Sequence, residues 1–547
     1  MNPPVSRRQV LATAGALAVA GGASAAAGLA STTSGAAPHG GGGGAADSAV
    51  RSAARDITRS AEDGTILTPT YLQLLTDDVH IEPRGQRIAI VGAGMAGLAA
   101  AYILQKAGHQ VRVIDAHPDR IGGRVQTLRD WHHPAAYAEA GALRIPGTHT
   151  LVTGLARHLG VGLRPFVRDD ESRILHVNGA MASRAQYRRH PRTLNKTFDV
   201  TDDRTASAML DDALEPVRAM VKGDSTDGWA RFLDQYDSWS LQRFLTDRAG
   251  LTAGELDLLD TLESGTARLP LSLTHALLTT TALPPDTRQW EIPGGMDHLP
   301  KALADKLDEG TLRPGWRLTG VDSRPAKLRL AVEKTGTGRP ENLEADRVII
   351  TAPFPALRYV TFTPDLSYGK RRAMQELRHG AATNVLLEFD QRWWGTDGGA
   401  DLSDTPLRRT VYPSHPSGDG GVVLASATSA DDAAVWDSMP GKARAGHALK
   451  LMTDLYGEDV ERSYTGRWAS PSWARNEYAC GEAARYAPGQ AVELGPHTRT
   501  PEADGRLWFA GDQTSTHYRA WIEGALESAC RVAYGMGVRP ATGRPGK

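Results

Sequence analysis

The sequence predicts an α/β protein with α+β insertions. Two strand–turn–helix segments carry the α/β signal, one at residues 87–108 and one at residues 506–534. Between them, residues 206–262 show the apolar spacing of amphipathic helices, and further apolar strands follow. The two ends of the chain are therefore expected to form one nucleotide-binding domain, with a helical insertion and a mixed α+β domain between them.

Residues 1–37 are predicted to be a targeting segment and not part of the fold. Ser6-Arg7-Arg8 opens a basic stretch, and an apolar stretch rich in alanine and glycine follows from Leu11 to Ala30. This arrangement resembles a twin-arginine export signal, a route that carries folded proteins; a basic tail is the alternative. Export predicts a secreted or cell-envelope protein. Residues 38–79 are then predicted to be a linker and lead-in.

The first strand–turn–helix segment predicts a dinucleotide site. Gly92 makes the tight turn, Gly94 lets the backbone approach a pyrophosphate, and Gly97 allows the helix to pack closely on the strand. The amino terminus of the helix then faces the phosphates. Asp115, at the end of the strand predicted at residues 110–114, is placed to accept hydrogen bonds from ribose hydroxyls. Together these features favour nucleotide binding far more strongly than the glycine motif would alone.

A second glycine turn follows at once. Gly122 and Gly123 can wrap backbone around a diphosphate, and Arg124 is predicted to be a charged clamp, although a plain surface turn is the alternative.

The later elements are predicted from their patterns. Thr252 with Glu255 forms a capping box. The apolar stripe of the helical insertion comprises Met209, Leu210, Ala213, Leu214, Val217 and Met220. Strands are predicted at residues 347–352, 383–389, 421–425 and 506–510, and a helix at residues 522–534.

Composition limits the partners. The chain has 62 basic and 63 acidic residues, so no excess charge favours nucleic acid or an anionic membrane surface, and a small molecule is the expected partner. No transmembrane helix is predicted. Two cysteines, Cys480 and Cys530, are too few for a disulfide framework and are predicted to be lone buried thiols. No metal site is expected, because His132, His133 and His415 lack the spacing of metal ligands.

The motifs VGAGMAGLAAAYIL, GGRVQT, RLWFAGDQTS and WIEGALES resemble those of the FAD-binding amine oxidase superfamily. The resemblance covers residues 87–534. It implies a Rossmann-type FAD-binding domain in three parts, at residues 80–150, 291–360 and 496–540. It also implies a helical and substrate insertion at residues 151–290 and a substrate-binding domain at residues 361–495.

The resemblance implies specific contacts with FAD. Asp512 would hold a ribitol hydroxyl, Ile522 would approach the flavin, and Val321 would meet the adenine through its backbone. The expected FAD contacts are Gly92, Gly94, Ala96, Gly97, Asp115, Ala116, Gly123, Arg124, Gly141, Ala142, Leu143, Arg144, Val321, Gly511, Asp512, Trp521, Ile522 and Ala525. FAD is expected to be non-covalent, because Glu482, and not Cys480, matches the position at which monoamine oxidases link their flavin.

The segment EAGALRIP, residues 139–146, resembles L-amino acid oxidases, and the scattered matches resemble the bacterial L-glutamate oxidase branch most. In that family Arg144 would clamp the substrate carboxylate, Tyr412 would donate a second hydrogen bond to it, and Trp521 would form an aromatic wall. Each has a plainer alternative: a salt bridge for Arg144, a core position at a strand end for Tyr412, and ordinary packing for Trp521.

The resemblance implies that an L-amino acid gives a hydride from Cα to flavin N5. The imine then hydrolyses to a 2-oxo acid and ammonia, and dioxygen is reduced to hydrogen peroxide. No second GxGxxG motif with its strand and helix is present, which argues against a nicotinamide partner. Two alternatives stay open. One is a flavin amine oxidase or dehydrogenase whose substrate lacks a carboxylate, and the other is a flavin-binding protein with little turnover.

One position departs from the family. Asn384 stands where family members usually carry a lysine that assists the reaction with oxygen, so oxygen reactivity is expected to be lower or to depend on another group. The accepted side chain is not specified by the sequence, although His275 and Arg288 could face an acidic one. The family often forms dimers, so a homodimer is expected.

Overall fold

The computed structural model describes residues 43–59, 66–83, 85–168, 170–223, 225–263, 268–283, 287–415 and 418–541. The predicted signal at residues 1–37 lies outside the described residues. The chain divides into two units, Met1–Ala45 and Ala46–Lys547, and the second contains all elements discussed below except the first three residues of α2 (Gly43–Thr58).

A five-stranded sheet forms the nucleotide-binding domain. Its order is β11 (Leu312–Pro314), β3 (Gln110–Asp115), β2 (Arg87–Val91), β15 (Arg347–Ile350) and β24 (Leu507–Phe509), with every pair parallel. Ile88 to Val91 are all buried, as expected for a central strand covered on both faces. Strands from the start, middle and end of the chain therefore meet in one sheet, as the predicted fold class requires.

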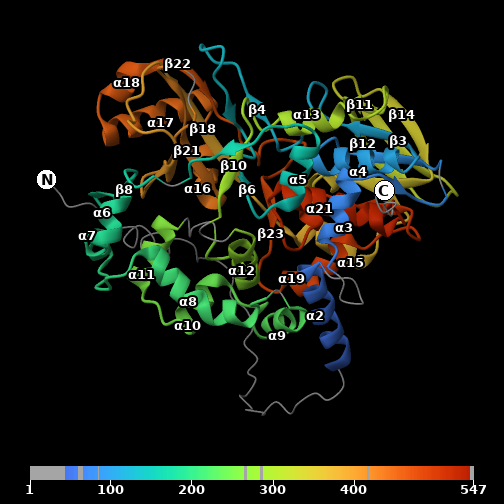
Figure 1. Ribbon diagram of the computed structural model, residues 1–547, viewed down its shortest axis with the longest axis horizontal. Coiled ribbons are helices and arrows are strands. Elements are labelled where there is room, and N and C mark those ends of the chain that lie inside the picture. The colour runs from blue at the N-terminus through green and yellow to red at the C-terminus, as the bar shows by residue number, and fades with distance from the viewer. Residues whose placement is uncertain are drawn as a thin grey trace, which may run out of the picture. The chain divides into compact units, whose positions relative to one another are not determined.

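Two helices from opposite ends of the chain pack together over this sheet, α4 (Met95–Lys106) and α21 (Ile522–Gly535) (Figure 1). Residues Met95 to Leu104 are buried, and the small side chains of Ala99, Ala100 and Ala101 allow close approach. Helix α4 begins three residues before the predicted start, because Gly94 already occupies the N-cap. The surrounding helices are α3 (Thr68–Thr76), α5 (Thr150–His158) and α13 (His298–Ala304). The segment before β2 thus packs on the nucleotide-binding domain through α3.

The helical insertion follows its predicted pattern. Its helices are α8 (Ala206–Met220), α9 (Thr226–Tyr236), α10 (Leu241–Asp247), α11 (Ala253–Leu262) and α12 (Leu273–Ala282). Each begins with a serine or threonine side chain that accepts a backbone hydrogen bond, and Thr252 with Glu255 forms the predicted capping box.

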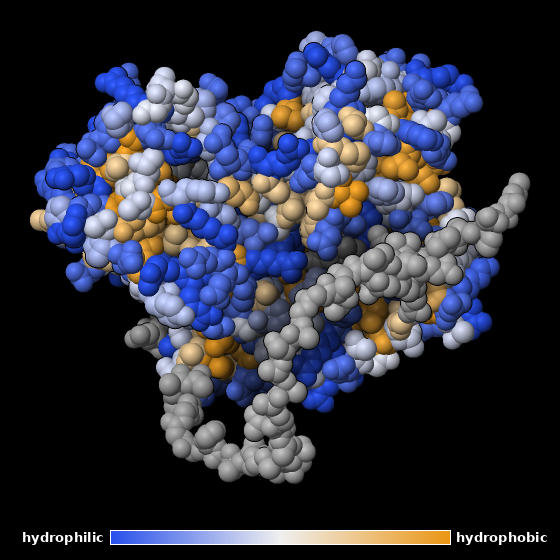
Figure 2. All heavy atoms as spheres, turned by 180° about the vertical axis from the view of Figure 1, so that it is seen from behind, coloured by the Kyte–Doolittle hydropathy of each residue, from blue (hydrophilic) through white to orange (hydrophobic). Residues whose placement is uncertain are grey.

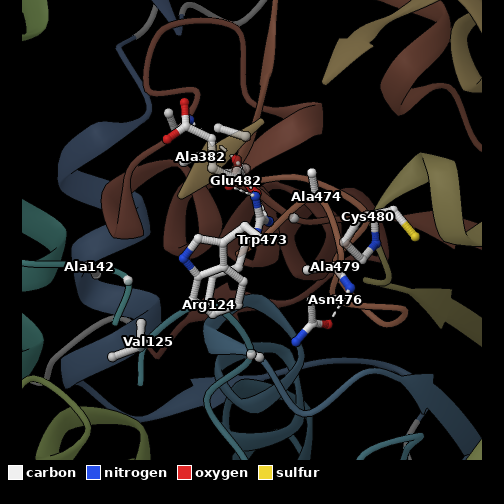
Figure 3. A pocket seen from close by; sticks show the side chains of 18 of the residues that line it. Arg124, Val125, Ala142, Ala382, Trp473, Ala474, Asn476, Ala479, Cys480 and Glu482 are labelled. Atoms are coloured by element: carbon white, nitrogen blue, oxygen red, sulfur yellow. Dashed lines mark hydrogen bonds and ion pairs between the residues drawn. The ribbon is translucent and has the colours of Figure 1, made fainter. Parts of the chain in front are cut away.

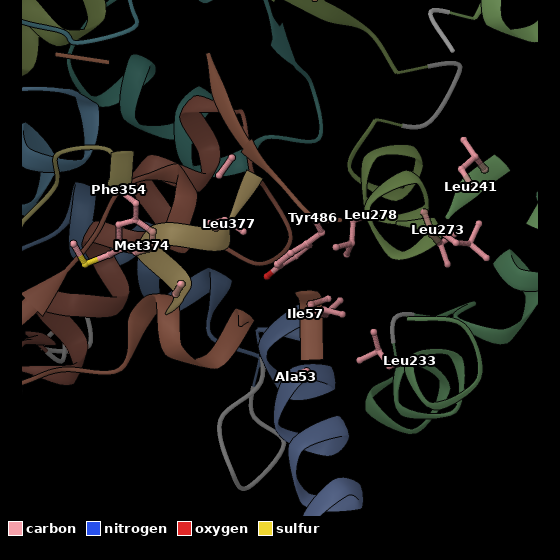
Figure 4. Close-up of a cluster of buried hydrophobic side chains, with 14 of the residues drawn as sticks. Ala53, Ile57, Leu233, Leu241, Leu273, Leu278, Phe354, Met374, Leu377 and Tyr486 are labelled. Carbon is pink, nitrogen blue, oxygen red and sulfur yellow. The ribbon is translucent and has the colours of Figure 1, made fainter. Parts of the chain in front are cut away.

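One hydrophobic cluster joins this insertion to the rest of the unit. Figure 4 shows Ile57 of α2 (Gly43–Thr58) near Leu233 of α9, Leu278 of α12 and Tyr486. Phe354 and Met374 belong to the same cluster on the side of the nucleotide-binding domain. The insertion is therefore fixed to the domain by burial of apolar side chains.

A seven-stranded sheet builds the substrate domain. Its order is β22 (Tyr464–Ala469), β18 (Ala382–Phe389), β21 (Gly421–Ser429), β20 (Arg409–Val411), β19 (Ala400–Ser403), β8 (Ile174–Val177) and β9 (Ala180–Ser183). Helices α16 (Ala430–Asp437) and α17 (Gly441–Tyr456) pack on β18 and β21, followed by α18 (Asp459–Ser463) (Figure 1). Because β8 and β9 join this sheet, part of the segment 151–290 belongs structurally to the substrate domain.

Smaller elements complete the fold. The other sheets contain β6 (Ile145–Pro146), β10 (Gln289–Glu291) and β7 (Arg164–Pro165); β14 (Pro340–Ala345), β13 (Leu328–Lys334), β12 (Trp316–Asp322) and β16 (Thr361–Thr363); and the pairs β1 (Val79–His80) with β25 (Arg539–Pro540), β4 (Thr127–Leu128) with β5 (Ala138–Glu139), and β17 (Arg378–Gly380) with β23 (Ala483–Arg485). The short helices are α6 (Arg184–Arg189), α7 (Arg192–Asn195), η1 (Lys196–Phe198), α14 (Phe354–Leu357), α15 (Tyr368–Glu376), α19 (Gln490–Glu493), α20 (Gly495–Arg499) and η3 (Asp512–Thr514).

The face shown in Figure 2 is mainly hydrophilic, with hydrophobic residues in separate areas. Within the described ranges, no helix combines the length and apolar character needed to cross a membrane.

Candidate active site

A cavity of about 1280 Å³ opens at the carboxyl ends of the parallel strands. The residues that end or follow four of these strands line it: Val91, Asp115, Thr351 and Gly511. It extends to helices α8, α10 and α12 on one side and to strands β18, β20 and β21 on another. This is the edge at which open α/β sheets bind their ligands.

The glycine turn after β2 fits a diphosphate. Gly92 has a φ of +106°, and a Cβ on it would come within 2.5 Å of Thr351 Oγ1. A Cβ on Gly97 would lie 1.9 Å from the Gly92 carbonyl oxygen, so Gly97 serves the close packing that its spacing predicts and does not itself line the cavity. A Cβ on Gly94 would meet no atom closer than 4.0 Å, so that position leaves room for a ligand beside the backbone.

The first turn of α4 also faces this cavity. Its N-cap, Gly94, offers no side-chain cap, and Met95 and Ala96 line the cavity. The amide groups of a helix amino terminus favour an anion. The residues present therefore fit the diphosphate of FAD.

Asp115 holds the turn together. Its carboxylate accepts hydrogen bonds from the backbone N–H groups of Ala93 at 2.6 Å and His117 at 2.8 Å. Burial raises the pKa of Asp115, while these two hydrogen bonds oppose that rise. Asp115 lines the cavity, and its contact with a ribose remains a prediction.

Arg124 and Asp512 form an ion pair across the cavity wall, so residues from the first and last motifs contact each other directly. Arg124 Nη1 also donates to the carbonyl of Glu482 at 2.6 Å. Figure 3 shows Arg124 next to Trp473 and the segment that runs to Glu482. Both charged groups line the cavity as predicted, and the pairing balances the charge of the buried Asp512 carboxylate.

The remaining expected FAD residues lie in the same cavity with one exception. The lining includes Ala116, Gly123, Gly141, Ala142, Leu143, Arg144, Trp521, Ile522 and Ala525. Val321 does not line it, and this prediction is wrong. Val321 is buried within β12, whereas Leu318 and Thr319 reach the cavity. A strand advances about 3.3 Å per residue, so Val321 lies about 10 Å beyond Leu318, past the cavity wall.

Three of the four predicted catalytic residues come together in the cavity: Arg144, Trp521 and Asn384. The Arg144 guanidinium carbon lies 6.0 Å from the centre of the Trp521 ring. Asn384 Nδ2 donates to the carbonyl of Ala140 at 3.3 Å, and Trp473 Nε1 donates to the same oxygen at 2.9 Å. The segment before Arg144 is thus tied to β18 and to Trp473.

Tyr412 is the exception, and its predicted role is wrong. Arg409 and Val411 line the cavity, so alternation along the chain turns Tyr412 away from it. Its hydroxyl is buried and donates to Asp401 at 2.7 Å, and its ring stacks on Trp394. The core position at a strand end, weighed as the alternative, is the one observed.

Several arginines that the sequence did not single out line the part of the cavity near the helical insertion. These are Arg268, Arg408, Arg409, Arg485 and Arg519. Arg485 and Arg519 lie in the segments YACGEAARY and RAWIEGA, but no functional role was expected of them, and the fold brings them to the cavity that α12 also lines. Of the two residues considered for an acidic side chain, His275 lines the cavity, while Arg288 does not and instead lies over Trp290 at 5.4 Å.

Arg268 and His275 have distinct surroundings. The side chain of Arg268 faces the cavity and is accessible from it. Protein surrounds this part of the cavity, and the resulting desolvation lowers the pKa of Arg268. Glu263 provides an opposing charge. His275 is buried, and desolvation together with the charges of Arg485, Arg519 and Arg268 lowers its pKa well below its usual value, so it is neutral at pH 7.

Cys480 lines the cavity and is only partly buried, whereas Cys530 is fully buried; both are free. The prediction of two buried thiols holds for Cys530 alone. The described part of the chain contains no cluster of metal-ligating side chains.

Comparisons with known proteins agree with this site. The family model described as flavin containing amine oxidoreductase matches residues 95–536. An L-glutamate oxidase precursor of Streptomyces viridosporus is 35% identical, over 88% of this chain and 90% of the relative. A putative L-amino-acid oxidase of Bacillus subtilis, YobN, is 31% identical, over 86% of this chain and 98% of the relative.

Solved structures show the same fold. Putrescine oxidase bound to putrescine superposes with a TM-score of 0.67 at 20% identity, covering 83% of this chain and 99% of that one. Cyclohexylamine oxidase from Brevibacterium oxydans gives 0.65 at 18% identity, covering 83% and 98%. The chain therefore belongs to the flavin-containing amine oxidoreductase family, and it is an FAD-dependent enzyme.

Proposed function

We propose that this enzyme oxidatively deaminates an L-amino acid with an acidic side chain, L-glutamate first, and that dioxygen is its electron acceptor. The observation that carries the proposal is the presence of Arg144 and Arg268 in one cavity. Arg144 and Arg268 are two of several arginines that line this cavity, and a substrate with two carboxylates offers a partner to each of them. The names of two relatives, both L-glutamate oxidase precursors, support the same substrate.

Each residue has a defined task in this proposal. Arg144 binds the α-carboxylate, and Trp521, whose ring lies beside it, forms the wall against which the substrate rests. Arg268 binds the side-chain carboxylate, and neutral His275 donates or accepts a hydrogen bond beside it. A bound FAD supplies the acceptor for the hydride that leaves Cα, and water then converts the imino acid to a 2-oxo acid and ammonia. The protein's main contribution is to position the substrate.

Substitutions at the two arginines test the substrate assignment. Arg144→Ala should lower kcat/KM for L-glutamate by about a hundredfold or more, because it removes a charge-assisted hydrogen bond to a buried carboxylate. Arg268→Gln should raise KM for L-glutamate by about tenfold or more and change KM for L-glutamine much less. The measurement is a peroxide assay over a range of both substrates. Equal effects of Arg268→Gln on both would show that Arg268 does not bind the side-chain carboxylate.

The decarboxylated analogue of glutamate, 4-aminobutyrate, separates this function from that of an oxidase for simple amines. The proposal expects turnover of L-glutamate and none of 4-aminobutyrate, because Arg144 would then be left without a partner carboxylate. Preference for the amine would contradict it.

We also propose that the protein is exported by the twin-arginine route and that FAD binds without a covalent bond. Ser6-Arg7-Arg8 and the following apolar stretch support export, as do the names of two relatives as precursors. Replacement of Arg7 and Arg8 by lysine should leave the protein inside the cell, which fractionation would detect. FAD should be released into the supernatant when the purified enzyme is precipitated with acid.

A further inference from the structure

A second cavity of about 80 Å³ lies next to the large one. Four residues line both cavities: Glu139, Leu143, Val411 and Leu424. These residues form a wall that the two cavities share.

The small cavity lies close to the position that departs from the family. Asn384 lines the large cavity, and Leu386, two residues further along β18, lines the small one. Residues two apart on a strand share a face and lie about 7 Å apart. Leu386 also pairs with Leu424, which lines both cavities. The small cavity thus meets the large one beside Asn384.

Apolar side chains form one part of the lining of the small cavity. They are those of Ala138, Phe166, Ile292, Met296, Leu386 and Val422. The one acidic group at the junction, Glu139, accepts hydrogen bonds from Met296 N–H at 2.8 Å and from the Thr127 hydroxyl. Burial raises the pKa of Glu139 to about 8, so this carboxyl is largely neutral at pH 7.

Size and polarity together restrict what can occupy this space. A water molecule needs about 10–15 Å³ of such volume, so the cavity holds a few molecules of that size. Beside the apolar part of the lining, the charges of an amino acid zwitterion would have no partners, which is costly. Small apolar molecules are the ligands that dry apolar cavities accept.

Polar residues form another part of the lining, and hydrogen bonds hold several of them in place. Arg164 Nε donates to Glu291 at 2.7 Å, and its Nη2 donates to the Tyr137 hydroxyl at 2.6 Å. The ring of His415 lies 3.1 Å from the Pro165 carbonyl through Nε2. These contacts join β7, β10 and the segment after β20 around the small cavity.

We propose that the small cavity is a passage through which dioxygen reaches the active site beside Asn384, separate from the space that the amino acid occupies. The proposal rests on the proposed function, since dioxygen must be the acceptor. It places dioxygen on the side of the cavity where family members usually carry the lysine that assists its reduction.

Val422 offers a direct test, because it lines the small cavity and not the large one. Val422→Phe should fill the passage, and Val422→Ala is the matched control that widens it. The reduced enzyme, prepared anaerobically with L-glutamate, is mixed with dioxygen and followed by flavin absorbance. Val422→Phe should lower the second-order rate constant of reoxidation by about tenfold and leave the rate of flavin reduction by L-glutamate unchanged. Val422→Ala should reoxidise at least as fast as the unaltered enzyme.

A second variant and a structural measurement keep the test valid if Val422→Phe fails to fold. Ala138→Leu fills the same cavity from β5, and xenon under pressure should occupy the small cavity in crystals of the unaltered holoenzyme. Reoxidation at the unaltered rate in both filled variants, with FAD bound, would overturn the proposal, as would the absence of xenon from the cavity. If the unaltered enzyme itself fails to react with dioxygen, the acceptor assigned under the proposed function is wrong instead.

Discussion

Asn384 brings no positive charge to the cavity, and its amide donates to the Ala140 carbonyl. A cation near the site of oxygen reduction stabilises the negative charge that develops there. We therefore predict that this side chain limits the reaction of the enzyme with dioxygen.

Asn384→Lys should raise the rate constant for reoxidation by dioxygen by about tenfold or more. The rate of anaerobic flavin reduction by the amino acid should change little, because Arg144 and Trp521 stay in place. Stopped-flow absorbance in the two half-reactions measures both rates. Asn384→Gln serves as the control, and a similar acceleration in that variant would show that charge is not the cause.

Glu139 should make stability depend on pH. Its pKa is raised to about 8 in the folded protein, above the value near 4.5 of the unfolded chain. The folded state then binds more protons than the unfolded state between these values. The stabilising contribution is complete below about pH 4.5 and is lost as the pH rises through 8.

Glu139→Gln removes this titration. The Tm of the unaltered protein should fall relative to that of Glu139→Gln between pH 5 and pH 8, and the difference should level off above pH 8. Thermal unfolding of both proteins across this range gives the answer. A constant difference in Tm would mean that Glu139 stays ionised throughout.

At the scale of elements, the glycine turn, helix α4 and strands β2 and β3 follow from local pattern, and the structure confirms them. The same holds for the capped helices of the insertion. Local pattern did not place Val321 and Tyr412. The role of each depends on which residue of a strand faces the cavity. Val321 lies beyond the cavity wall, and Tyr412 turns into the core and donates to Asp401.

The arginines at the helical end could not be found by pattern at all. Arg268 precedes α12, while Arg485 and Arg519 belong to segments more than 200 residues later in the chain. They meet because helices and strands from different parts of the chain close around one cavity. Tertiary packing, and not sequence spacing, creates this group.

The close contact of α4 with the glycine turn before it should make stability and FAD binding sensitive to a larger side chain at Gly97. In Gly97→Ala the added Cβ would lie 1.9 Å from the Gly92 carbonyl oxygen, so the turn must move. The variant should lose about 1–3 kcal/mol or more of stability and bind FAD more weakly. Gly446→Ala, in the exposed part of α17 where a Cβ meets nothing within 4 Å, is the control and should be slightly stabilising. Thermal unfolding and FAD titration compare the two; equal behaviour would contradict the packing role of Gly97.

At the scale of the whole molecule, a cavity between three structural layers joins a cofactor site to a substrate site. The nucleotide-binding sheet supplies the glycine turn and Asp115, the seven-stranded sheet supplies Asn384, and the helical insertion supplies His275. The division into an FAD-binding domain, a helical insertion and a substrate domain stays a prediction. A homodimer stays a prediction.

Anaerobic reduction of the FAD-loaded enzyme tests the assignment of L-glutamate as substrate most directly. The enzyme is mixed with L-glutamate and, in parallel, with L-glutamine and 4-aminobutyrate, and the loss of flavin absorbance is measured. Carboxylate binding by Arg144 and Arg268, both in the lining of one cavity, predicts rapid bleaching by L-glutamate, slower bleaching by L-glutamine, and none by 4-aminobutyrate. Bleaching by 4-aminobutyrate as fast as by L-glutamate, or no bleaching by L-glutamate, would contradict the assignment of Arg144 and Arg268 as carboxylate ligands.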